Sequence, residues 1–92
     1  MRYRERLQAR IEATGSRLCV GIDPRPGEGG VGEVPEFLER LVGETWEHAA
    51  AFKPNIAYFE AMGLRGVEIL DQLLGRMPDE VPVILDAKRS DI

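Results

Sequence analysis

Three short apolar stretches of the sequence each end in ionisable residues. Asp23 follows the first stretch, and Lys53 lies near the end of the second. Asp86 follows the third, with Lys88 and Asp91 shortly after it. Asp86, Lys88 and Asp91 have the spacing Asp-x-Lys-x-x-Asp, and on an extended chain the first two can face the same side. Alternating charges at short range keep one another ionised and hold an ammonium in place. Such an array could donate a proton from a defined direction and repel a substrate carboxylate.

The chain contains ten arginines but only two lysines, Lys53 and Lys88. A lysine ammonium can give up a proton, whereas an arginine guanidinium cannot. A genome biased toward arginine codons would explain the imbalance without any chemistry, and an isolated Asp-x-Lys-x-x-Asp can be a surface ion pair. Both lysines nevertheless belong to the group of ionisable residues near the ends of the apolar stretches. Their position therefore favours a chemical role.

Hydrophobic periodicity predicts the elements that must position these residues. Leu38, Leu41, Val42, Thr45, Trp46 and Ala49 recur at helical spacing, as do Val67, Leu70, Leu73 and Leu74. Gly15 ends the first predicted helix, and the last one could break near Gly63 and Gly66. The predicted helices are 2–13, 35–50 and 58–77; the predicted strands are 18–22, 51–54 and 81–85; residues 24–34 form a loop.

Strands that alternate with helices predict an α/β fold with parallel strands joined by right-handed crossovers. Continuously apolar strands predict a sheet covered on both faces. Functional groups of such folds gather beyond the carboxyl ends of the strands. We expect one domain over residues 1–92, with the ionisable residues together at one edge of its sheet.

Composition excludes several classes of function. A net charge of −4 argues against non-specific nucleic-acid binding, and no apolar run reaches the length of a membrane span. The single Cys19 cannot form an internal disulfide, which indicates the cytoplasm. We interpret Cys19 as a core residue and His48 as a structural or surface residue. No cluster has metal-ligand spacing, and the glycine-rich segment 27–30 lacks the pattern of a phosphate loop.

Three segments resemble orotidine 5′-phosphate decarboxylase, and in particular its bacterial branch. They are residues 18–24 (LCVGIDP), 51–60 (AFKPNIAYFE) and 83–92 (VILDAKRSDI). The resemblance covers nearly the whole chain from Leu18 onward, with three separate motifs in the right order. Ser90 departs from the pattern, since glycine is usual there, and the local backbone could therefore differ slightly.

The resemblance implies a (β/α)8 TIM barrel, of which this chain would be the N-terminal portion with the first three βα units. The family decarboxylates orotidine 5′-phosphate to uridine 5′-phosphate without a cofactor or metal, as a homodimer with active sites at the interface. By resemblance, Lys88 donates the proton to C6 of the pyrimidine, and Asp86 lies against the substrate carboxylate and orients Lys88. Asp91 reaches into the partner subunit's site.

The same resemblance assigns substrate-binding roles to residues of the first two strands. Lys53 would hydrogen-bond to the ribose and to the carboxylate network. Asp23 would bind a ribose hydroxyl, and Asn55 would contribute nearby.

A complete barrel of this kind typically needs about 250 residues. We therefore expect the 92-residue chain alone to be inactive and to associate through its open edge and exposed apolar faces. Two other interpretations remain open at this point. One is a related barrel that performs metal-dependent aldolase or epimerase chemistry on a sugar phosphate. The other is a non-catalytic truncated chain that only self-associates.

Overall fold

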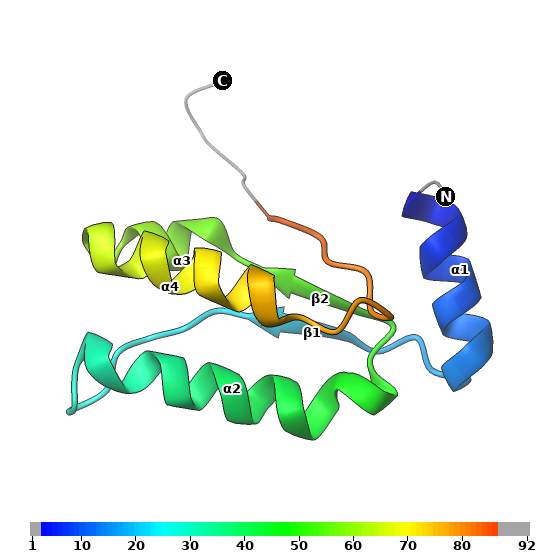
Figure 1. The fold of residues 1–92 in the computed structure, drawn as a ribbon, viewed down its shortest axis with the longest axis horizontal. Coiled ribbons are helices and arrows are strands. Elements are labelled where there is room, and N and C mark those ends of the chain that lie inside the picture. Colours follow the sequence, from blue (N-terminus) through cyan, green and yellow to red (C-terminus); the bar gives the residue numbers. More distant parts are fainter. Residues whose placement is uncertain (1–2, 87–92) are drawn as a thin grey trace.

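The computed structural model describes residues 3–86 (Figure 1). Lys88 and Asp91 lie outside these residues. None of the helices in the described part of the chain is long and apolar enough to cross a membrane. In chain order the elements are α1 (Tyr3–Thr14), β1 (Cys19–Ile22), the 3-10 helix η1 (Val31–Glu33), α2 (Val34–Thr45), the 3-10 helix η2 (Trp46–His48), β2 (Ala51–Pro54), α3 (Ile56–Glu60) and α4 (Gly63–Arg76).

The sheet is parallel, as predicted. β1 pairs with β2 in a register that runs from Cys19 opposite Ala51 to Ile22 opposite Pro54. The predicted third strand, 81–85, does not form a continuous strand. Instead, the chain after α4 pairs with the other edge of β2 through two isolated parallel bridges, at Val83 and at Asp86. Backbone hydrogen bonds between residues 82–86 and residues 52–56, donated from both sides, accompany these bridges.

The two faces of the sheet differ, which corrects the expectation that both are covered. Val20 is half-buried and Ile22 is buried, whereas Cys19 and Gly21, which alternate with them along the strand, are exposed. Side chains alternate between the faces of a strand, so one face of β1 packs against the helices and the other is open. The interpretation of Cys19 as a core residue is therefore wrong, because no described element covers its side of β1.

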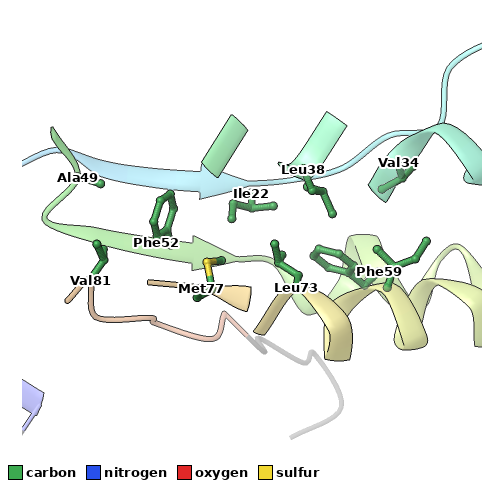
Figure 2. Close-up of a cluster of buried hydrophobic side chains, with 10 residues drawn as sticks. Ile22, Val34, Leu38, Ala49, Phe52, Phe59, Leu73, Met77 and Val81 are labelled. Atoms are coloured by element: carbon green, nitrogen blue, oxygen red, sulfur yellow. The ribbon is translucent and has the colours of Figure 1, made fainter. Parts of the chain in front are cut away.

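The core lies on the helix side of the sheet and combines residues from both strands with residues from the helices (Figure 2). Phe52 and Phe59 are fully buried, and they are the largest side chains of the cluster. Full burial of one large apolar side chain contributes roughly 1.5–3 kcal/mol. The buried members of the cluster are Ile22, Val34, Leu38, Ala49, Phe52, Phe59, Ile69, Leu73, Met77 and Val81.

The predicted helix 58–77 is two helices, and the break is at Gly63, as the sequence suggested. Gly63 has φ 75°, a left-handed conformation that favours glycine. Gly66, in contrast, lies inside α4, where an added Cβ would collide with the carbonyl oxygen of Phe59. Gly66 thus allows the first turn of α4 to approach α3 closely.

The buried face of α4 also differs from the predicted one. Val67 was expected to face inward but is 46% exposed, whereas Ile69 is buried. Leu73 is buried as predicted, and Leu70 packs against the edge of the core. The contact between Gly66 and Phe59 turns the helix so that the stripe through Gly66, Ile69 and Leu73 faces the sheet.

Helix α1 lies apart from the other helices, near the amino ends of the strands (Figure 1). Arg10 links it to the rest of the chain by donating hydrogen bonds to the carbonyl oxygens of Ala49 (3.0 Å) and Trp46 (2.6 Å). The helix ends at Gly15, whose φ is 67° and whose amide donates to the Ile11 carbonyl (2.8 Å).

Candidate functional site

The register of the strands brings three of the predicted site residues to one edge of the sheet. The β1–β2 ladder ends at Ile22 and Pro54, and the amide of Asn55 then donates to the Ile22 carbonyl (3.0 Å). Asn55 is in turn bridged to Asp86. Asp23, Asn55 and Asp86 therefore follow three neighbouring, parallel segments at the same level, which is where parallel α/β folds carry their functional groups.

Lys53 lies one pleat before this edge, on the open face of the sheet. Its side chain is exposed, although its neighbours Phe52 and Pro54 are both buried. In the register it stands opposite Gly21, which has no side chain to fill the space above β1. Among residues 3–86 the Lys53 ammonium makes no hydrogen bond or ion pair, and its three N–H donors are available to a ligand.

Asn55 has a structural role at this edge. Its side-chain oxygen accepts a hydrogen bond from the amide of Ala57 (3.1 Å), so Asn55 is the N-cap of α3. The cap starts a helix immediately after β2 and so sets the direction in which the chain leaves the edge. Within residues 3–86, the side-chain NH₂ group of Asn55 donates no hydrogen bond.

The structure adds two residues that the sequence analysis did not single out, Arg25 and Tyr58. The Arg25 guanidinium donates to the Tyr58 hydroxyl (2.8 Å) and lies 5.2 Å from the centre of its ring. The hydrogen bond to Tyr58 raises the pKa of Arg25 above its ordinary value, and the nearby Asp23 carboxylate contributes in the same direction. The only sequence signal was an arginine between two prolines directly after the Asp-Pro motif.

This pair borders a hollow of about 390 Å³ beside the carboxyl edge. The hollow lies between the loop after β1 and helix α3, and it is lined mainly by apolar side chains. They are Pro24, Pro26, Val31, Ala61 and Met62, with Arg25 and Tyr58.

The remaining sequence-predicted residues are placed as follows. Asp86 is half-buried at the edge, and Lys88 and Asp91 lie outside the described residues. His48 is exposed in η2, before the start of β2 and thus at the opposite end of the strand, in agreement with its interpretation as a surface residue. Within residues 3–86 no three His, Cys, Asp or Glu side chains are grouped closely enough to hold a metal ion.

No protein-family model matches the chain. Individual relatives match it at about 40% identity. The chain is 42% identical to orotidine 5′-phosphate decarboxylase of Methylibium petroleiphilum over 101 residues, which cover all of this chain and 36% of the relative. It is 41% identical to the enzyme of the same name from Halorubrum lacusprofundi over 104 residues, which cover all of this chain and 35% of the relative.

Solved structures give the same result. The chain is similar to the Leishmania donovani OMP decarboxylase with a TM-score of 0.84 and 41% identity, over all of this chain and 35% of that one. It is similar to a putative orotidine-monophosphate decarboxylase from Toxoplasma gondii with a TM-score of 0.86 and 42% identity, over 96% of this chain and 32% of that one. The chain thus spans about a third of the length of the proteins that it matches.

Proposed function

We propose that this chain, a homologue of the orotidine 5′-phosphate decarboxylases, supplies the first three βα units of a (β/α)8 barrel. The barrel would convert orotidine 5′-phosphate to uridine 5′-phosphate. The observation that carries the proposal is the common level of Asp23, Asn55 and Asp86 at the carboxyl edge, with Lys53 just before it. Relatives that are about 40% identical over the whole chain support it.

In the proposed reaction the bond between C6 of the pyrimidine and the carboxylate breaks, and carbon dioxide leaves. The electron pair stays at C6, and the Lys88 ammonium stabilises it and then transfers its proton to that carbon. Solvent returns a proton to the lysine. Asp86 lies against the substrate carboxylate and orients Lys88, so that the ammonium acts from one direction. Neither step uses a cofactor.

Lys53, on the open face of the sheet, and Asp23, at its carboxyl edge, would both bind the ribose. Lys53 is suited to this role because it is exposed among buried neighbours. Asn55 would add a donor while it caps α3. Binding energy from the phosphate, which is remote from C6, can be used to reach the transition state.

We further propose a cytoplasmic homodimer in which Asp91 of each subunit reaches the site of the other. The single cysteine of the chain is compatible with a reducing compartment. Sedimentation of the protein with and without uridine 5′-phosphate would test the dimer.

The decisive experiment is to express the protein from its complete coding sequence and to follow release of carbon dioxide from orotidine 5′-phosphate. We expect Lys88→Ala to lower kcat at least about 100-fold, the usual contribution of general acid catalysis. Arg65→Ala is the matched control. It also removes one cation, but from an exposed pair with Glu68 (3.4 Å) on α4. Wild-type protein that releases no carbon dioxide would refute the proposal.

Two further measurements separate the remaining interpretations. Turnover that persists in excess chelator is expected of the decarboxylase, and a loss that Mg²⁺ restores would instead indicate the metal-dependent aldolase or epimerase. The 92-residue chain alone is expected to show no turnover, because the solved relatives are about three times longer.

A further inference from the structure

The Arg25–Tyr58 pair connects the chain after β1 to the chain after β2. Arg25 comes two residues after Asp23, and Tyr58 lies in α3, which starts directly after Asn55. Each partner is therefore a close neighbour of a residue that the proposed function places in the substrate site. A contact between these two segments fixes how the ends of β1 and β2 lie relative to each other beyond the sheet.

One guanidinium makes two kinds of contact with the same phenol. It donates to the hydroxyl at 2.8 Å, and its central carbon lies 5.2 Å from the ring centre, within the range of a cation–π contact. A planar guanidinium can stack and donate together, which an ammonium does less well. The geometry thus defines the orientation of Arg25 as well as its distance from α3.

The loop between β1 and η1 has few other attachments. Pro24 is buried at its start, and the amide of Gly30 donates to the Gly27 carbonyl (3.0 Å) within the loop itself. Within residues 3–86, two hydrogen bonds tie residues 23–30 to other residues: the Glu33 amide of η1 donates to the Gly30 carbonyl (3.2 Å) at the end of the loop, and Arg25 donates to Tyr58 across to α3. The bond to Tyr58 is therefore the hydrogen bond that joins this loop to α3.

Asp23 lies between the two fixed points of this loop. On one side, the Ile22 carbonyl accepts the amide of Asn55 (3.0 Å), and on the other, Arg25 is held by Tyr58. Asp23 is also close enough to Arg25 to act on its charge. The Asp23 carboxylate is thus restrained from both directions, although it is exposed and makes no hydrogen bond within the described residues.

We propose that Arg25 and Tyr58 are positioning residues that hold the Asp23 carboxylate where it binds a ribose hydroxyl of the nucleotide. This role rests on the proposed function, which assigns the ribose to Asp23. Neither residue is expected to touch the reacting carbon, so the pair affects binding of substrate and transition state equally. Its loss should therefore raise KM and leave kcat nearly unchanged.

The first test measures the contact itself, in the protein expressed from its complete coding sequence. Amide hydrogen exchange of residues 27–30, which follow the two prolines of the loop, is compared in wild type, Arg25→Ala and Tyr58→Leu. Both variants should exchange faster in this loop and alike elsewhere. Tyr58→Phe keeps the ring and removes the hydroxyl, so we expect an intermediate rate. Unchanged exchange in the loop would overturn the proposal, whatever the activity of the protein.

The second test measures the consequence for binding, by titration calorimetry with uridine 5′-phosphate. We expect Arg25→Ala and Tyr58→Leu each to weaken binding about three- to tenfold, as the loss of one exposed hydrogen bond with its ring contact would. Tyr58→Leu is the control for charge, because it removes the contact and keeps the Arg25 cation. If only Arg25→Ala weakens binding, the arginine acts by attracting the phosphate, and the positioning role is refuted.

The third test asks whether the pair acts through Asp23. In the Asp23→Asn background, Arg25→Ala should cause little further loss of affinity, since the group that it positions is already altered. An equal loss in both backgrounds would overturn positioning through Asp23. Failure of the wild-type protein to bind uridine 5′-phosphate would instead refute the proposed function, and this role with it, while hydrogen exchange would still decide the contact.

Discussion

Phe52 and Lys53 are adjacent on β2, and they face opposite environments. Phe52 is 0% exposed and belongs to the core cluster, where it lies beside Ile22 of β1 (Figure 2). Lys53 is exposed on the open face, opposite Gly21 of β1. The same two-residue period of a strand that places one side chain in the core places the next in solvent.

The comparison separates stability from chemistry within one strand. Residues on the helix side can hold the fold because they lose apolar surface to water, and their size and shape are constrained. Residues on the open side are free of packing constraints and can present charge to a ligand. Ala51 is an exception, since it is buried although it alternates with Phe52, and its small side chain leaves the open face unobstructed.

The largest expected effect comes from truncating the buried member of the pair. Phe52→Ala should lower the free energy of unfolding by about 3–5 kcal/mol, because it removes transfer free energy and leaves a cavity. Lys53→Ala is the control on the neighbouring residue and should change stability by less than about 0.5 kcal/mol. Urea denaturation followed by circular dichroism measures both. Comparable losses in the two variants would show that the open face is covered after all.

For nucleotide binding we expect the reverse order, with a larger effect from substituting Lys53 than from substituting Phe52. Lys53→Ala is expected to lose affinity for uridine 5′-phosphate without unfolding, by about 1.5–3 kcal/mol if a charged hydrogen bond to the ligand is lost. Lys53→Arg keeps the charge but not the compact ammonium, and it should restore the affinity only partly. Normal binding by Lys53→Ala would remove this residue from the proposed site.

A smaller effect tests the close approach of α3 and α4 on the helix side. Gly66→Ala forces a Cβ against the Phe59 carbonyl and within 2.7 Å of the Met62 Cβ, so the two helices must move apart. We expect a loss of about 1–3 kcal/mol, as for other overpacked sites. Gly43→Ala in α2 is the matched control, because no atom lies within 4 Å of its added Cβ. That variant should stabilise the protein by about 0.4–1 kcal/mol.

A further prediction concerns Asn55, which lies at the carboxyl edge of the sheet. Asn55→Ala removes the acceptor of the Ala57 amide and should cost about 1 kcal/mol of stability. Asn55→Asp keeps an acceptor and should be close to neutral in stability. If Asn55→Asp nevertheless weakens nucleotide binding, the side-chain NH₂ contributes to the site in addition to the cap.

The smallest perturbation is chemical labelling of Cys19, which probes the open face without a substitution. Cys19 is exposed in this structure, so a thiol reagent should react with the folded 92-residue chain nearly as fast as with the unfolded chain. In the protein from the complete coding sequence, further strands of the proposed barrel would cover this face and slow the reaction. Equal rates in both proteins would argue against closure of a barrel over β1.

Local patterns in the sequence were enough to predict the order of the helices and of the first two strands, their parallel pairing and the break near Gly63. Hydrophobic periodicity, prolines and glycines determine the backbone conformation of the few residues around them. The structure agrees with most of the boundaries predicted from them. The same patterns placed Asp23, Lys53 and Asp86 at the ends of successive apolar stretches, and the family resemblance added Asn55. The rule for parallel folds then predicted their common edge, and the register confirms it for Asp23 and Asp86, while Lys53 lies within the ladder just before the edge.

Tertiary contacts decided the rest. The exposure of Cys19 depends on which elements cover β1. The rotation of α4 that buries Ile69 depends on the close approach of Gly66 to Phe59. The contact of Arg25 with Tyr58 joins residues 33 positions apart. Neither the apolar run of β1 nor the helical period of α4 contains this information, because a side chain's environment is set by neighbours that only folding brings to it.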